Sequence, residues 1–77
     1  MAMRELDLAA LRTPLPDRGL VAGDVGTIVF VHDAGTAYEV EFVAADGGTI
    51  AVETLGNDDL EPVSGRQILH VRNLTAA

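Results

Sequence analysis

Two β-prone runs on either side of a short turn constrain this chain more than any other feature. The runs are Val25 to Val31 and Tyr38 to Val43, and His32-Asp33-Ala34-Gly35-Thr36 lies between them. Runs rich in Val, Ile, Tyr and Phe that flank a polar, glycine-containing turn predict an antiparallel hairpin. An isolated two-stranded ribbon is marginal in water, so we expect the rest of the chain to cover its apolar face.

The second run has a clear two-sided pattern. Tyr38, Val40 and Phe42 alternate with Glu39 and Glu41. Successive side chains of a strand point to opposite faces, so we expect the first three in the core and the two glutamates in water.

The first run leaves its register open. Gly26 has no side chain to pack and is typical of a bulge or of a close backbone approach. Strict alternation places Val25, Thr27, Val29 and Val31 on one face. A shift at Gly26 instead turns inward Val25, Ile28 and either Phe30 or Val31.

The flanking segments complete an all-β pattern. Asp46-Gly47-Gly48 predicts a second hairpin turn, followed by a strand over 49–55. Residues 56–60 predict one helical turn, capped by Asn57 or Asp58, ahead of a short closing strand, with Leu60 plugging the core. Residues 6–11 fit either a short strand or a helix that the prolines at 14 and 16 would end.

Length and composition limit the chain to one small domain. Its 77 residues give room for one core and no enzyme-sized cleft, and the absence of cysteine removes disulfides and thiolate metal sites. The first 13 residues contain acids and no long apolar stretch, so we expect no signal peptide and no membrane span. These features predict a cytoplasmic protein.

The charge balance disfavours nucleic acid as a partner. Twelve acidic residues face five basic ones, all arginines, for a net charge of −7. Nucleic-acid affinity depends on clustered Lys and Arg, and the three aromatic residues offer no clear stacking platform.

The sequence contains no motif for catalysis, cofactors or metals. It lacks the GxGxxG and Walker spacings, His32 and His70 have no metal-ligand spacing, and Asp58-Asp59 is typical of a capped turn. We therefore predict that the chain is not an enzyme and that it uses no cofactor.

What remains is surface that could bind a protein partner or a second copy. An acidic strand face, the loop over 15–23 and the terminal segment are the three candidates. Their predicted partner-binding residues are Glu39, Glu41, Glu53, Arg18, Leu20, Leu69 and Val71.

Five motifs in order carry a resemblance to a known family. They are LPDRGLVAGDVGTIV (15–29), YEVEF (38–42), GGT (47–49), TL (54–55) and DLEPV (59–63). From about residue 6 to residue 63 the chain resembles short bacterial proteins classed as a domain of unknown function. The GDVGT stretch is more loosely similar to the KOW element of SH3-like barrels.

The resemblance implies a small, five-stranded, bent SH3-like barrel, with a short helical turn before the last strand. It implies that residues 6–11 form the first strand, that residues 1–64 form the barrel, and that residues 65–77 extend beyond it. Alternation of apolar residues over 66–74 would allow an additional edge strand there. The family implies no activity.

Three functions are consistent with these features. The first is a non-enzymatic SH3-like protein-interaction module. The second is an acidic antitoxin or immunity-type inhibitor of a basic partner protein. The third is KOW-like binding to RNA or the ribosome, which the net charge disfavours.

Overall fold

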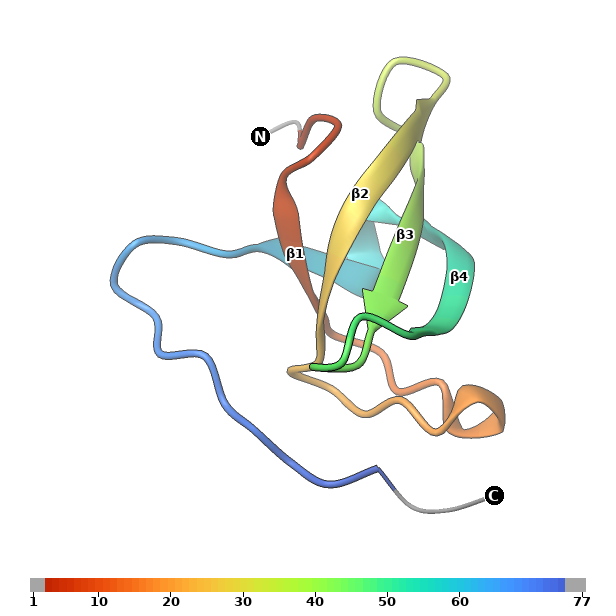
Figure 1. Cartoon of the computed structure of the whole chain (residues 1–77). Helices are drawn as coiled ribbons and strands as arrows, with labels where there is room; N and C mark the ends of the chain where they lie inside the picture. The colour runs from red at the N-terminus through yellow and green to blue at the C-terminus, as the bar shows by residue number, and fades with distance from the viewer. Residues whose placement is uncertain (1–2, 75–77) are drawn as a thin grey trace.

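The five strands form one antiparallel sheet in the order β4-β3-β2-β1-β5 (Figure 1). A computed structural model of the chain describes residues 3–74. The elements in chain order are β1 (Leu8–Leu11), η1 (Pro16–Arg18), β2 (Val25–His32), β3 (Ala37–Val43), β4 (Thr49–Gly56), η2 (Asn57–Asp59) and β5 (Leu60–Pro62). The predicted all-β class, the first strand and the helical turn before the last strand are confirmed.

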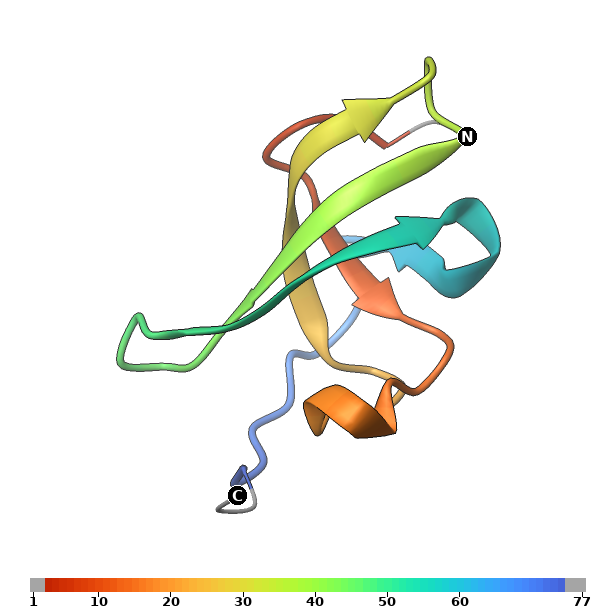
Figure 2. The ribbon, with the colours of Figure 1, turned by 90° about the vertical axis from the view of Figure 1, so that its right-hand side faces the viewer.

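The sheet is strongly twisted, so its two ends curl toward each other around the core (Figure 2). Within residues 3–74 no hydrogen-bonded pairing joins β4 to β5. Closure into a barrel therefore remains a prediction.

One face of the sheet carries the core. Tyr38, Val40 and Phe42 are buried, as their alternation predicts, and Ile28 lies opposite Val40. The core side chains are Met3, Ala9, Leu11, Leu20, Ile28, Tyr38, Val40, Phe42, Leu55 and Leu60. Leu60 plugs the core as expected.

The register of β2 follows from two separate features. Gly26 marks a close approach and not the bulge: a Cβ there would lie 2.6 Å from Val40 Cγ1 and 2.9 Å from the Glu41 carbonyl oxygen. The bulge lies further on, where the β2–β3 register shifts between Ile28 and Phe30. The extra residue lets Ile28 and Val31 both turn toward the core and leaves Phe30 49% exposed.

The predicted capping of η2 is wrong in detail. The Gly56 amide donates to Asp59 Oδ2 at 3.2 Å, so the side chain that caps the start of η2 is that of Asp59 and not that of Asn57 or Asp58. Asn57 instead donates its Nδ2 to the Gly35 carbonyl at 2.7 Å and so ties the β2–β3 turn to η2.

The additional edge strand expected over 66–74 is absent from the described part of the extension, residues 65–74, and residues 75–77 lie outside it. Pairing ends at Val63, whose amide donates to the Leu8 carbonyl at 3.3 Å. Beyond it the chain arches away from β5 and returns below the start of β2 (Figure 1). We call residues 64–74 the tail.

The close approach at Gly26 predicts a local intolerance to side chains. Gly26→Ala places a methyl group against Val40 and the backbone of Glu41, and such overpacking costs about 1–3 kcal/mol. Urea unfolding should show this loss. The control Gly65→Ala, whose Cβ meets nothing within 4 Å, should change stability by less than about 0.5 kcal/mol. Equal effects at the two positions would contradict the packing account.

Candidate functional site

The face of the sheet opposite the core is the first candidate surface. Residues that are cross-strand partners point to the same side of a sheet, so the register defines this face. One row crosses four strands as Leu8, Thr27, Glu41 and Val52, and a second row contains Phe30, Glu39 and Thr54. We call these seven residues the outer face.

The outer face exposes large apolar side chains. Leu8, Phe30 and Val52 are 43%, 49% and 51% exposed, respectively. Large apolar side chains exposed among polar groups on one sheet face make this face a candidate protein-binding surface.

The carboxylates of the outer face already have donors from their own sheet. Glu39 Oε2 accepts from Thr54 Oγ1 at 2.7 Å and lies 2.6 Å from His32 Nε2, and Glu41 Oε2 accepts from Thr49 Oγ1 at 2.8 Å. Hydrogen bonds from Thr54 and then from His32 hold the pKa of Glu39 below its ordinary value. These internal partners lower the cost of removing water from the face.

Glu53 does not extend this acidic surface. Its cross-strand partner is Val40, so it lies on the core side of β4. There its Oε2 lies 2.9 Å from Arg18 Nε, which ties η1 to the edge of the sheet. The predicted grouping of Glu53 with Glu39 and Glu41 is therefore wrong, although Arg18 and Glu53 do meet each other.

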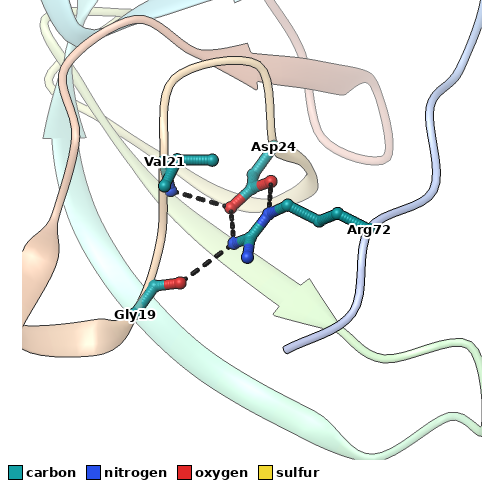
Figure 3. A network of polar contacts seen from close by, with 4 residues as sticks. All are labelled: Gly19, Val21, Asp24 and Arg72. Carbon is teal, nitrogen blue, oxygen red and sulfur yellow. Dashed lines mark hydrogen bonds and ion pairs between the residues drawn. The ribbon is translucent and has the colours of Figure 1, made fainter. Parts of the chain in front are cut away.

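A second candidate site lies where the tail returns to the loop between β1 and β2. Asp24 accepts at Oδ1 from Arg72 Nε at 2.9 Å and pairs through Oδ2 with Arg72 Nη2 (Figure 3). Arg72 Nη2 also donates to the Gly19 carbonyl at 2.9 Å. Two carboxylate oxygens and one carbonyl thus bind a single guanidinium group.

Local backbone structure fixes these acceptors. Asp24 Oδ2 accepts from the Val21 amide at 2.9 Å, and Gly23 has a φ of 97°, which favours glycine in the turn before Asp24. The turn is joined to β1 because the Gly23 amide donates to the Leu11 carbonyl at 2.7 Å and the Leu11 amide to the Asp24 carbonyl at 2.8 Å. Gly19, at φ 69°, ends η1.

The charges at this site stabilise each other. Hydrogen bonding from Arg72 is the main cause that lowers the pKa of the Asp24 carboxyl, and partial burial opposes it. The same contact raises the pKa of Arg72. The pair holds its charged form in the folded chain.

The other predicted partner-binding residues lie in different parts of the structure. The prediction for Leu20 is wrong: its side chain is 3% exposed and packs in the core, because its backbone pairs with Leu15 and turns the side chain inward. Leu69 and Val71 are 62% and 89% exposed on the tail. Neither lies on the outer face.

The described residues assemble no metal site: residues 3–74 contain no group of three or more His, Asp or Glu side chains placed to hold an ion. In the same residues no helix is long and apolar enough to cross a membrane. Of the three aromatic residues only Phe30 is exposed. Its ring lies edge-on to that of His32, with 4.8 Å between the two ring centroids.

Sequence reasoning missed Asp24, Gly19 and Arg72. Asp24 and Arg72 are 48 residues apart, and no local pattern joins them. Phe30 was one of two alternatives for the core, and only the position of the bulge decides between them.

Acid should release Arg72 from Asp24. Asp24 has a pKa below the ordinary 3.8 in the folded chain, so the stabilisation is complete well above 3.8 and is lost as the pH falls below it, through the lowered folded pKa. In an NMR titration the Nε–H resonance of Arg72 should hold its position at neutral pH and move toward that of a free arginine only below 3.8. Arg66, which takes part in no ion pair within residues 3–74, is the control. A transition of Arg72 near neutral pH would contradict this assignment.

Comparison with known proteins gives a family and no activity. No curated protein and no solved structure shows a significant match to the chain. The family model described as "Domain of unknown function (DUF4926)" matches residues 5–62, which contain all five strands. The predicted resemblance to a short family of unknown function is thus confirmed, and the chain belongs to the DUF4926 family.

Proposed function

We propose that this protein is a non-enzymatic, SH3-like protein-interaction module that docks a partner protein on its outer face. The observation that carries the proposal is the exposure of Leu8, Phe30 and Val52 in adjacent rows of one sheet face. Aromatic residues are enriched among interface anchors, and Phe30 is the exposed aromatic side chain of this face.

The SH3-like assignment is supported by topology. The hairpins of β2, β3 and β4 follow one another, and β1 lies between β2 and β5. A single 3-10 turn, η2, separates β4 from β5, as the predicted barrel requires.

The polar part of the outer face supports a protein and not a nucleic-acid ligand. Glu39 and Glu41 lie in the same rows as the apolar residues and would repel phosphate. The net charge of −7 favours a basic partner, so an inhibitor of a basic protein is the second candidate function.

Affinity capture with matched variants tests the outer face. Immobilised wild-type chain should recover a specific protein from a lysate of its own source cells. Phe30→Thr keeps a β-prone residue and removes the aromatic anchor, so it should lower recovery at least about tenfold.

The control is Ile68→Thr, which removes a comparably apolar side chain from the tail, where it is 94% exposed. This variant should recover the partner as well as the wild type. Loss of the partner with Ile68→Thr and retention with Phe30→Thr would refute docking on the outer face.

A further inference from the structure

The Asp24 site has the construction of a receptor for an arginine side chain. Its acceptors are the two Asp24 carboxylate oxygens and the Gly19 carbonyl oxygen. They are held by the β1–β2 loop and by β1, through the Val21 amide and the backbone of Leu11. None of these supporting bonds comes from the tail, so we expect the site to keep its geometry when Arg72 does not occupy it.

The tail that fills the site is weakly attached elsewhere. In residues 64–74 the other hydrogen bonds are local, from the Ser64 amide to Gln67 Oε1 at 2.7 Å and from the Gln67 amide to the Ser64 carbonyl at 3.3 Å. Arg72 makes the only polar contacts between these residues and the rest of the described chain. One side chain therefore holds the segment in place and could be displaced.

The tail also fits the surface beneath it poorly. A groove of about 340 Å³ remains between residues 67–70 and a strip that contains Ala10, Val25 and Glu61 of the sheet and Val63 just after β5. Ile68 and Leu69 line this groove but are 94% and 62% exposed, so they fill little of its apolar part. A segment with better-placed side chains would bury more surface on the same strip.

Charge indicates what such a segment must be. All 12 carboxylate side chains of the chain lie between Glu5 and Glu61, whereas the sequence from Ser64 onward has two arginines and none. The tail thus has the composition that the body attracts. A second copy would bring its own 12 carboxylates close to the first, so repulsion favours a different protein as the source of the ligand.

We propose that Asp24 and the Gly19 carbonyl bind an arginine on an extended segment of a partner protein that is poor in carboxylates, and that Arg72 occupies this site in the isolated chain. The proposal adds a second contact to the proposed interaction function and names the chemistry of the partner. Lysine should bind this site more weakly than arginine, because one ammonium group does not reproduce the side-on pair of N–H donors that Asp24 accepts.

A peptide titration followed by NMR tests this site in the full chain. The probe is a synthetic peptide with the sequence of residues 64–77, and the receptor is the Arg72→Ala variant, whose own guanidinium is removed. The peptide should cause saturable shifts of the Val21, Gly23 and Asp24 amides. The wild type should bind it at least about tenfold more weakly, because the tethered Arg72 competes at high effective concentration.

Two matched controls isolate the guanidinium. Asp24→Asn in the Arg72→Ala chain keeps an oxygen for the Val21 amide and removes the charge, and it should abolish the shifts. A probe with lysine in place of Arg72 should bind at least about tenfold more weakly. The proposal is overturned if the Arg72→Ala chain gives no saturable shifts, or if either control leaves binding unchanged.

Sedimentation tests whether a second copy of the chain supplies the arginine. The wild type should remain monomeric as its concentration rises. A wild-type dimer that Arg72→Ala dissolves would show that the ligand is a second copy, which would overturn the assignment to a different protein. None of these results depends on Phe30, so docking on the outer face can fail or hold independently.

Discussion

The close approach of β3 to the backbone of β2 is the constraint on which the rest of the structure depends. Val40 and Phe42 pack where a side chain at residue 26 would otherwise lie. Because this position is a glycine, the apolar side chains of β3 reach into the centre of a very small core. Ile28 and Tyr38, both fully buried, then complete the packing around them.

Burying one face of a five-stranded sheet leaves the other face to solvent and partners. In residues 3–74 the only elements besides the sheet are η1 and η2, two 3-10 turns that are too short to form a second layer. The bulge after Ile28 adds to the apolar surface of this exposed face, since it keeps Val31 toward the core and leaves Phe30 outside. The same geometry that completes the core thus creates the apolar surface proposed to bind a partner.

Some of the carboxylates of this strongly acidic chain have partners within the fold. Arg18 pairs with Glu53, Arg72 pairs with Asp24, and Glu39 contacts both His32 and Thr54. Two of these pairs, Arg18 with Glu53 and Arg72 with Asp24, join segments that are far apart in sequence. The tail contact differs from the others because it attaches a segment with no strand pairing.

Much of the fold is predictable from local pattern. The alternation of Tyr38, Val40 and Phe42 determines the core face of β3, and the turn residues determine both hairpins. Glu53 could also have been placed correctly, because it is two residues from Leu55 and so shares the face that Leu55 buries.

Other features cannot be predicted from local sequence. Glycine is typical of bulges and also of close backbone approaches, so the presence of Gly26 alone does not determine the register of β2. The burial of Leu20 depends on how its loop folds back on Leu15, and the contact of Arg72 with Asp24 is a tertiary one. The candidate site was therefore less predictable than the sheet.

Amide hydrogen exchange on the full chain tests the central claim most directly, that a single sheet forms the folded body and the tail is held to it by one arginine. The account predicts strong protection for Ile28 and Val40 and little protection for the amides of residues 66–71, which make no strand hydrogen bonds. Protection of residues 66–71 at the level of β2 and β3 would contradict it, because the tail would then be a strand of the sheet.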